Sequence, residues 1–415
     1  MEMKKYKLGE IADFVDEKIS SSSISLDEYV TTDSLLQDKR GRTTAQNLPP
    51  QPCNLTRFKK GDVLIGNIRP YLKKIWFADI EGGCSLDVLA LRAKKEAESA
   101  YLYSLLMQDD FFTFVMKAPK GSKMPRGDKN HILTYPCFDI QHKIEVGKFI
   151  KSLDDKIALN RRINAKLEAM AKRLYYHWFV QFDFPGADGK PYKSSDGKME
   201  YNATLKREIP AGWEVKRLGE VISKIDSGKR PAGGIDKSLT SGIPSLGAEC
   251  IDELGVFDFS ATPFIDFSYS EKMKTGKIEN NDILIYKDGA YVGKTTLFRD
   301  NFPYKDAFVN EHVFLIHANK ETLEEYLYFV LTQKTYFQIM QNLGKAKAAQ
   351  PGLNREDLQN ILLLIPSDDR VLAFHKKVEP LFAQIFNNAK TMGKLTALRD
   401  RLLPLLMNGQ VEVKK

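Results

Sequence analysis

The chain has few cysteines, and their positions exclude two common kinds of site. Cys53, Cys84, Cys137 and Cys250 are the only four among 415 residues. They are far apart and form no Cys-x-x-Cys pair, so the sequence indicates neither a zinc site nor a disulfide framework. We expect four reduced, buried thiols in a cytoplasmic protein.

The histidines are also few and show no spacing typical of metal ligands. His312 and His317 are five residues apart, which would place them on opposite faces of a strand. The sequence therefore predicts no metal site. The six histidines are at positions 131, 142, 177, 312, 317 and 375.

Long apolar runs are missing as well. No segment approaches the roughly 18 to 20 apolar residues that a membrane-spanning helix requires. The first ten residues, MEMKKYKLGE, contain no apolar core of a signal peptide. We therefore expect no contact with a membrane and a cytoplasmic location. An apolar content of 43% in 415 residues favours two or three globular domains.

Signatures of DNA-modifying and DNA-cleaving enzymes are absent. The one Pro-Pro pair, in Asn47–Gln51, has the wrong spacing for the Asn/Asp-Pro-Pro-aromatic loop of an amino-methyltransferase. A nuclease core needs an acidic residue and a lysine on adjacent strand positions. Asp154-Asp-Lys156 lies at a helix start, and Glu214-Val-Lys216 has no partner acid. We expect no enzyme activity, no catalytic residue and no cofactor.

One stretch does look like a catalytic motif, YKDGAYVGKTTLF at residues 286–298. A phosphate-binding loop needs Gly-x-x-x-x-Gly-Lys-[Ser/Thr] after a strand and before a helix. Gly289 leaves the loop one residue short of Gly293, and the flanking segments 282–286 and 295–298 both have strand composition. The sequence predicts a strand–turn–strand hairpin here and no ATPase site.

What the chain does have is an excess of positive charge. Its 62 Lys and Arg residues exceed its 54 Asp and Glu residues, which gives a formal net charge of +8. Such an excess favours a polyanionic partner, nucleic acid above all.

The chain also repeats itself over a long period. Lys7-Leu-Gly-Glu-Ile11 recurs as Arg217-Leu-Gly-Glu-Val221, and Gly61-Asp-Val-Leu-Ile65 recurs as Asn281-Asp-Ile-Leu-Ile285. Each copy ends in an apolar strand and a proline, and a long helical pattern follows. We infer two similar mixed α/β globules, each followed by one long helix.

The two helical patterns have matching heptad seams. Asn160 and Asn388, at an offset of 228 residues, occupy equivalent positions, where a polar residue fixes the register of a helix pair at a cost in stability. A helix of about 27 residues is roughly 40 Å long, so the pair would hold the globules a fixed distance apart. The alternative is two unrelated amphipathic surface helices. The predicted seam residues are Leu153, Ile157, Asn160, Asn164, Leu167, Leu174, Ile385, Asn388, Met392, Leu395 and Leu402.

Aromatic residues outside this seam are candidates for a partner surface. We expect them to stay exposed in the isolated chain. They are Tyr175, Tyr176, Phe179, Phe382 and Phe386.

A polar segment separates the two copies. Residues 186–197 are rich in Gly, Ser, Asp and Lys and indicate an exposed linker, and Ile209-Pro-Ala-Gly-Trp213 begins the second globule. The expected divisions are a first globule at 1–140, a long helix at 141–182, a linker at 183–207, a second globule at 208–366 and a second long helix at 367–415.

Each copy carries a basic loop at the same place. Residues 117–129 contain five cations in thirteen residues, interrupted by prolines and glycines, and the counterpart is 342–355. Cations suit phosphate contact, and Arg, Asn and Gln can also hydrogen-bond base edges. The alternative is a solvated surface loop.

The predicted hairpins add cations to these loops. Residues 66–74 are the first copy's equivalent of 286–298 and keep a turn followed by cations. The candidate DNA-binding residues are Arg69, Lys73, Lys74, Lys117, Lys120, Lys123, Arg126, Lys129, Lys229, Arg230, Lys287, Lys294, Lys345, Lys347, Asn354 and Arg355.

In this order, the features resemble a known family. Ser152–Ala171, followed by Trp178-Phe-Val, is similar to the central conserved region of the specificity subunits of type I restriction–modification systems. Leu395–Gly409 resembles their C-terminal conserved region. The Leu-Gly-Glu openings, the Gly-Asp-Val-Leu-Ile strand, the Asp-Gly-Ala-Tyr-Val-Gly-Lys stretch and Ile-Pro-Ala-Gly-Trp also fit, so the resemblance covers essentially the whole chain.

The resemblance implies two pseudo-symmetric target-recognition domains separated by a pair of long antiparallel coiled-coil helices. Each mixed α/β domain would read one half of a bipartite, asymmetric sequence in double-stranded DNA. The helices would set the spacing and dock two methyltransferase subunits, and restriction subunits through them. S-adenosylmethionine, ATP and magnesium would belong to those partners, and this chain would be a non-catalytic specificity subunit in host defence.

Two other functions stay open from the residues alone. One is a nuclease or NTPase built on the turn at Lys294. The other is a helical scaffold that binds proteins only, whose binding would not depend on the cations of the basic loops.

Overall fold

The chain folds into two compact units, described here from a computed structural model. Unit 1 comprises Met1–Leu159 and Lys394–Lys415, and unit 2 comprises Asn160–Gly393. The sequence predicted consecutive divisions, whereas the C-terminal residues belong with the first globule. The structure describes residues 5–118, 124–231, 233–236, 238–259, 262–320, 323–345 and 352–413.

Unit 1 contains two four-stranded sheets. In the first, with the order β2–β9–β6–β7, neighbouring strands are antiparallel. In the second, with the order β3–β5–β8–β4, β4 runs parallel to β8. A further antiparallel pair joins β1 (Lys5–Lys7) to β10 (Pro136–Phe138). The sheet strands are β2 (Ala12–Phe14), β3 (Lys18–Ser20), β4 (Tyr29–Val30), β5 (Asn54–Phe58), β6 (Val63–Gly66), β7 (Ile75–Phe77), β8 (Gly82–Cys84) and β9 (Val88–Ala93).

The alternation of side chains along β6 divides the interior of unit 1 into two cores. Val63 and Ile65 face one core, and Leu64 faces the other, as expected for a strand that is buried on both faces. Leu403 and Leu406 from the C-terminal helix complete the first core. Each fully buried side chain of this kind stabilises the fold by about 1.5–3 kcal/mol. The helices of unit 1 are α1 (Leu8–Ile11), α2 (Ser99–Leu106), α3 (Asp109–Val115) and α4 (Lys129–Leu133).

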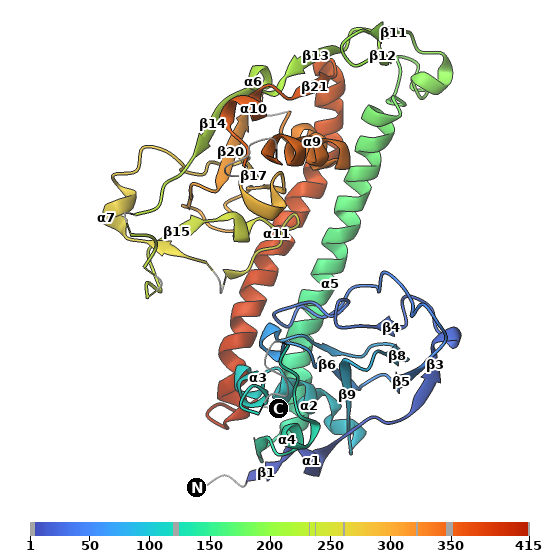
Figure 1. Ribbon diagram of the computed structural model, residues 1–415, viewed down its shortest axis with the longest axis vertical. Helices are drawn as coiled ribbons and strands as arrows, with labels where there is room; N and C mark the ends of the chain where they lie inside the picture. Colours follow the sequence, from blue (N-terminus) through green and yellow to red (C-terminus); the bar gives the residue numbers. More distant parts are fainter. Residues whose placement is uncertain are drawn as a thin grey trace. The chain divides into compact units, whose positions relative to one another are not determined.

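Unit 2 repeats this plan. Its main sheet has the order β14–β20–β17–β18, and β20 lies between β14 and β17 (Figure 1). Its second sheet has the order β16–β15–β19, and its parallel β15–β19 pair corresponds to β4–β8. In the described residues this sheet has three strands, whereas its counterpart in unit 1 has four. The strands are β11 (Met199–Asn202), β12 (Arg207–Pro210), β13 (Glu214–Arg217), β14 (Ile222–Ser227), β15 (Ile243–Leu246), β16 (Phe264–Ile265), β17 (Ile283–Tyr286), β18 (Thr295–Leu297), β19 (Phe308–Val309), β20 (Val313–Ala318) and β21 (Leu362–Ile365).

The short helices that open the two units are capped in the same way. The backbone N–H of Lys7 donates to Glu10 Oε1 at 2.7 Å before α1, and the N–H of Arg217 donates to Glu220 Oε2 at 2.6 Å before α6. These are the Leu-Gly-Glu segments of the repeat, where the glutamate satisfies a backbone donor at a helix start. The predicted mixed α/β repeat is confirmed. The shorter helices of unit 2 are α6 (Leu218–Val221), α7 (Phe267–Ser270), α8 (Glu324–Thr332), α9 (Lys334–Lys345) and α10 (Arg355–Gln359).

The segment 183–207 is largely exposed, as its composition indicated, but part of it has regular structure. It contains β11, which pairs with β12 in an antiparallel hairpin. The buried ring of Phe184 stacks on Tyr192 and Trp213, with centroids 4.6 and 5.3 Å away. A few aromatic residues within a polar stretch are enough to fold it against the protein.

Two long helices, α5 (Lys143–Tyr175) and α11 (Asp368–Met407), have 33 and 40 residues. Both exceed the expected length of about 27 residues, because α5 begins 10 residues before Leu153 and α11 begins 17 residues before Ile385. In unit 2 they run antiparallel: Asn164 contacts Ile385, and Tyr175, further along α5, contacts Phe374, earlier in α11. A π-helical turn (Tyr176–Val180) follows α5.

The seam of unit 2 contains a buried asparagine pair. Asn388 Nδ2 donates to Asn164 Oδ1 at 2.9 Å, and Asn164 Nδ2 donates to the carbonyl oxygen of Ile385 at 3.0 Å. Both asparagines are buried, whereas Asn160, predicted as the equivalent of Asn388, is half-buried. The antiparallel register therefore pairs Asn388 with Asn164. Of the other predicted seam residues, Leu153, Ile157, Ile385 and Met392 are buried, and Leu167, Leu174, Leu395 and Leu402 are half-buried.

The prediction of an exposed aromatic surface is wrong for four of its five residues, because only Tyr176 is exposed. Tyr175 packs against Phe329 and Phe374 with centroids 5.3 and 6.2 Å away, and Phe179 packs against Phe374 at 4.9 Å. Phe329 belongs to α8. The heptad pattern concerns α5 and α11 only, so it could not predict that α8 also packs against these aromatic residues.

The cysteines differ in their surroundings. Cys84 and Cys137 are buried, and burial raises the pKa of each thiol to about 12. Cys250 is half-buried, and burial raises its thiol pKa to about 12 too. Cys53 is exposed, so the expectation of four buried thiols is wrong at that position.

Candidate nucleic-acid interface

Two equivalent hairpins provide the backbone of the candidate site, one in each unit. In unit 1, β6 and β7 are joined by the short 3-10 helix η2 (Pro70–Leu72), and in unit 2, β17 and β18 are joined by η8 (Gly289–Tyr291). The hairpin predicted for the Gly-Lys-Thr stretch is confirmed. Thr295 begins a strand, so this stretch has no helix N-terminus to hold a phosphate.

The two tips share a left-handed backbone at two equivalent positions but have different residues there. Arg69 and Lys73 have φ values of 52° and 50°, and the equivalent Gly289 and Gly293 have φ values of 77° and 87°. The left-handed region costs a residue other than glycine roughly 1–2 kcal/mol. Unit 1 thus keeps two cations at its tip in spite of backbone strain, a feature that clusters at functional sites.

In unit 1 the tip contacts the basic loop. The backbone N–H of Arg69 donates to the carbonyl oxygen of Pro125 at 2.9 Å, and Ile68 forms a β-bridge with Arg126. The exposed Arg126 guanidinium lies 3.0 Å from Asp87. Two segments that the sequence singled out separately are therefore neighbours.

Two further cations of the unit 1 hairpin are engaged within the protein. Lys73 Nζ lies 3.0 Å from Asp109, which also pairs with Lys39 at 2.8 Å. Burial opposes ionisation of Asp109, but the two lysines together hold its pKa below the usual value. Lys74 Nζ donates to the carbonyl oxygen of Thr32, and burial lowers the pKa of Lys74. These two lysines hold the base of the tip in place.

The remaining cations of unit 1 flank the basic loop. Lys117 and Lys129 are exposed, and Lys129 Nζ lies 5.3 Å from the centroid of the Phe14 ring. Lys120 and Lys123 lie outside the described residues.

In unit 2 the tip has the same neighbour as in unit 1. Asp288 forms a β-bridge with Gly352, and the N–H of Leu353 donates to the carbonyl oxygen of Lys287 at 2.8 Å. Lys287 Nζ donates to the carbonyl oxygen of Glu311 at 3.0 Å. The contact between hairpin tip and basic segment is thus common to both units.

Beside this tip lies a charged cluster, in which His312 stands at the position that Asp87, the partner of Arg126, has in unit 1. Arg230 donates from Nε to Glu311, and its Nη2 lies 2.8 Å from His312 Nε2. His312 Nδ1 lies 2.8 Å from Asp288 Oδ2. Burial opposes ionisation of Glu311, but the Arg230 hydrogen bond and the other contacts keep the pKa of Glu311 below its usual value. Arg230 is therefore held by a carboxylate.

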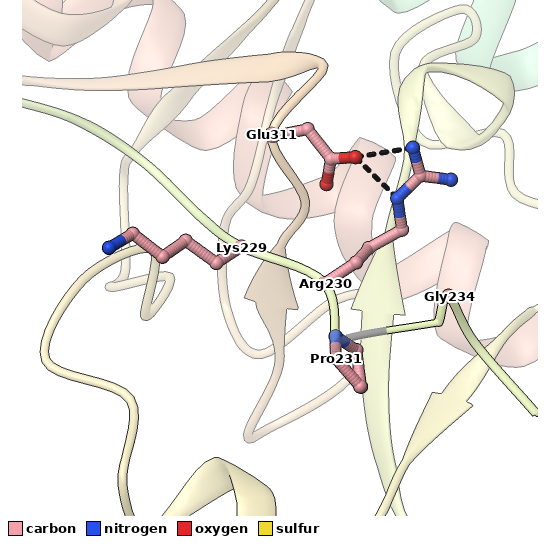
Figure 2. A pocket seen from close by; sticks show the side chains of 5 residues that line it. All are labelled: Lys229, Arg230, Pro231, Gly234 and Glu311. Carbon is pink, nitrogen blue, oxygen red and sulfur yellow. Dashed lines mark hydrogen bonds and ion pairs between the residues drawn. The ribbon is translucent and has the colours of Figure 1, made fainter.

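An open hollow of about 530 Å³ lies at this cluster, lined by Lys229, Arg230, Pro231, Gly234 and Glu311. Figure 2 shows Arg230 turned toward the Glu311 carboxylate, whereas Lys229 points away from that pair. The lining thus offers one exposed cation in Lys229 and one paired cation in Arg230.

Asn354 has a structural role in the free protein. Its side chain accepts a hydrogen bond from the backbone N–H of Asp357 at 2.6 Å and caps α10. Asp128 caps α4 of unit 1 in the same way, at 2.9 Å from the N–H of His131. The side-chain oxygen Oδ1 of Asn354 is therefore bound to the N-terminus of α10, a role that the sequence did not predict.

The other predicted cations of unit 2 differ in their engagement. Lys294 Nζ lies 3.4 Å from Asp252, and Arg355 Nη2 donates to the carbonyl oxygen of Ile225 at 2.7 Å. Lys345 is exposed at the end of α9. Lys347 lies outside the described residues.

Sequence reasoning missed two tyrosines. Tyr71 in η2 and Tyr291 in η8 occupy equivalent positions at the two tips, and they are 51% and 66% exposed. The shared tyrosine in Arg69-Pro-Tyr71 and Gly289-Ala-Tyr291 was the available signal. A tyrosine carries neither the charge nor the amide by which the other candidates were recognised.

Two other kinds of site were sought in the described part of the chain. Within it, no three or more His, Cys, Asp or Glu side chains gather as a metal would require. No helix there is both long enough and apolar enough to cross a membrane.

Comparison with protein families matches residues 210–377 to the type I restriction modification DNA specificity domain. The chain is 27% identical over 393 residues to the specificity subunit of the type I restriction enzyme MjaIX from Methanocaldococcus jannaschii, which covers 91% of this chain and 83% of the relative. It is 24% identical over 471 residues to the specificity subunit of the type I restriction enzyme HindI from Haemophilus influenzae, which covers 98% and 99%.

A solved structure shares the fold. The crystal structure of a type I restriction–modification system S subunit from M. genitalium aligns with a TM-score of 0.57 at 14% identity, covering 99% of this chain and 96% of that one. At this identity the likeness speaks for the fold alone.

Proposed function

We propose that this chain, a relative of the specificity subunits of type I restriction enzymes, binds double-stranded DNA and supplies the sequence specificity of a type I restriction–modification complex. The observation that carries the proposal is the contact between hairpin tip and basic segment in both units. Cations at such an edge suit the phosphates, and arginine can pair with guanine in the major groove.

Each unit would read one half of a bipartite, asymmetric sequence. The two tips present different side chains on the same backbone, with Arg69 exposed in unit 1 and the Arg230–His312–Asp288 chain of hydrogen bonds in unit 2. Two different sets of donors and acceptors would select two different short sequences.

The long helices would dock two methyltransferase subunits, and restriction subunits through them. Ile163 and Met170 are exposed apolar residues, and their spacing of seven residues along α5 places them on one face. S-adenosylmethionine, ATP and magnesium would be bound by the partners, so that methylation, ATP hydrolysis and cleavage take place there. The chain itself would contribute recognition and no catalytic group.

A map of methylated adenines in host DNA tests the proposal, with the gene for this chain present and deleted. We expect methylation to disappear at one split motif, two short halves around a fixed gap of several base pairs. An unchanged map, in cells where the partner methyltransferases are expressed, would contradict the proposal.

Charge variants then test the assignment of halves. Replacing Arg69, Lys117 and Arg126 of unit 1 by serine should weaken sequence selection in one half of the motif and leave the other half unchanged. The control replaces three exposed lysines of segment 183–207, which changes the net charge equally. The control lysines are Lys190, Lys198 and Lys206.

A further inference from the structure

We propose that Tyr71 and Tyr291 are DNA-contacting residues with the same role in the two units, each packing its ring against a sugar or base of the bound duplex. The inference rests on the proposed function and adds to it a contact that depends on apolar surface. Neither residue was among the candidates that the sequence provided.

The backbone fixes both tyrosines while their rings lie in solvent. The N–H of Lys73 donates to the carbonyl oxygen of Pro70 at 2.9 Å, and the N–H of Lys294 donates to the carbonyl oxygen of Tyr291 at 2.9 Å, so each tyrosine lies within a hydrogen-bonded turn. A preformed turn loses little conformational entropy when its ring meets a ligand.

Chance is a poor explanation for an exposed tyrosine at the same position of both tips. On either side of the tyrosine the two tips have diverged, with Arg69 and Lys73 in one and Gly289 and Gly293 in the other. Tyrosines that are 51% and 66% exposed contribute little to the core, so packing within the chain does not account for the shared residue. A role at the surface that both units need does account for it.

The surroundings of the rings indicate what they meet. In unit 1, the hairpin tip that carries Tyr71 contacts Arg126 through the β-bridge of Ile68. The N–H of Asn67, in the same tip, donates to the carbonyl oxygen of Asp87 at 2.8 Å. The residue before Asp87 is Leu86, which is apolar and exposed. Cations beside an apolar ring match the alternation of phosphate and sugar or base along a DNA strand. A tyrosine ring offers a large contact area with a polar end that stays wet.

The test separates a charged contact from an uncharged one by salt dependence, and a ring contact from a hydroxyl contact by the phenylalanine variants below. Affinity would be measured for the full chain with its methyltransferase partners, on a duplex of the sequence selected by the wild-type protein from a random pool. Each phosphate contact contributes about 0.9 to the slope of log affinity against log salt. We expect Tyr71→Ala and Tyr291→Ala each to weaken binding about tenfold with the slope unchanged, since a ring releases no counterions.

Two further variants serve as controls. Tyr201, 69% exposed in the β11–β12 hairpin, is a matched surface tyrosine, and Tyr201→Ala should leave affinity unchanged within about twofold. Tyr71→Phe and Tyr291→Phe should bind nearly as well as wild type, because the ring carries the contact. Thermal unfolding of each variant should match wild type, which excludes loss of structure as the cause.

Each outcome decides a different point. If the wild-type complex binds with a steep salt slope but the alanine variants at 71 and 291 behave like Tyr201→Ala, the inference fails and the proposed function stands. If the phenylalanine variants lose as much affinity as the alanine variants, with the slope unchanged, the hydroxyl carries the contact as a neutral hydrogen-bond donor and apolar contact is wrong. If the wild-type complex shows no salt-dependent binding to the duplex, both proposals fall.

Discussion

The hairpin tips of the two units have kept one backbone frame and changed what it holds. The N–H of Asn67 donates to the carbonyl oxygen of Asp87 at 2.8 Å, and the equivalent N–H of Lys287 donates to that of His312 at 3.0 Å. At one tip position unit 1 has Arg69, whereas unit 2 has Gly289 and brings Arg230 to the tip from a neighbouring segment. The comparison shows that a shared backbone positions the hairpin tip in each unit. The side chains on that backbone differ, and they distinguish the two units.

The units also differ in how their helices are held. In unit 1, Tyr103 donates to Asp154 at 2.8 Å, and Arg399, only 4% exposed, lies 2.9 Å from the same carboxylate. In unit 2, Phe382 and Ala171 occupy the positions equivalent to Asp154 and Arg399, and both are buried. Unit 2 instead holds α11 through Arg299, which pairs with Glu325 and Glu379 at 2.6 and 3.2 Å. The units thus place their ion pairs at different positions along the helices.

Breaking the ion pair between Asp154 and Arg399 should have the largest effect. Arg399→Met leaves the Asp154 carboxylate with its tyrosine but without its cation, and removing one partner of a buried pair costs about 3–5 kcal/mol. Chemical denaturation should show this loss in the free energy of unfolding.

The double variant Asp154→Leu with Arg399→Met makes unit 1 resemble unit 2 and provides the control. It should recover a large part of the loss, because an apolar pair of similar volume often replaces a buried ion pair without cost. Arg399 also pairs with Asp400 at 2.9 Å. A double variant as unstable as Arg399→Met would show that the loss of this second pair, and not the unpaired Asp154, sets the cost.

Exchanging the tip residues should have the next largest effect. A Cβ at Gly293 would lie 2.8 Å from Met340 Cβ in α9, and the backbone there is left-handed, so Gly293→Lys should destabilise unit 2 by roughly 2–4 kcal/mol. At Gly289 the nearest atom is Tyr286 Oη at 3.7 Å, so Gly289→Arg should cost only about 1–2 kcal/mol for the backbone. Equal losses at both positions, measured by denaturation, would show that backbone strain alone sets the cost.

The reverse change in unit 1 should move stability and binding in opposite directions. Arg69→Gly relieves a left-handed backbone and should raise the free energy of unfolding by about 0.5–1 kcal/mol. It also removes an exposed cation, so DNA affinity should fall and the salt slope should decrease by about 0.9 if Arg69 contacts one phosphate. A variant that gains stability and keeps the wild-type slope would place Arg69 away from the DNA.

A structural feature could be predicted from the sequence where the residues that determine it are close together in the chain. The hairpin at residues 286–298 was predictable because its strands and glycines are adjacent in the chain. The buried asparagines were predictable from periodicity, but their pairing was not, since the antiparallel register depends on how the two helices meet. The capping role of Asn354 was not predictable, because an amide can cap a helix or hydrogen-bond a base and its residue type favours neither.

Contacts distant in sequence left no signal at all. Arg230 and Glu311 are brought together by the β14–β20 pair, and nothing in either segment names the other. Tyr175 and Phe179 looked like a free surface until α8 was seen to cover them. The candidate site was thus located by the repeat, whereas the state of each charge within it required the structure.

The pairing of Arg230 allows the smallest and most specific test of the comparison. Leu86 of unit 1 is the equivalent of Glu311, so Glu311→Leu gives unit 2 the residue of unit 1 and releases the Arg230 guanidinium. Because the pKa of Glu311 lies below its usual value, the carboxylate is charged near neutral pH, and the effect should not vary with pH in that range. We expect a DNA salt slope steeper by at most about 0.9, the contribution of one additional phosphate contact.

Leu86→Glu should have the opposite effect in unit 1, where the new carboxylate would stand beside Asp87 and repel phosphate. If both variants keep the wild-type slope, these tips do not face the DNA backbone, and the cations that bind it lie elsewhere on the units.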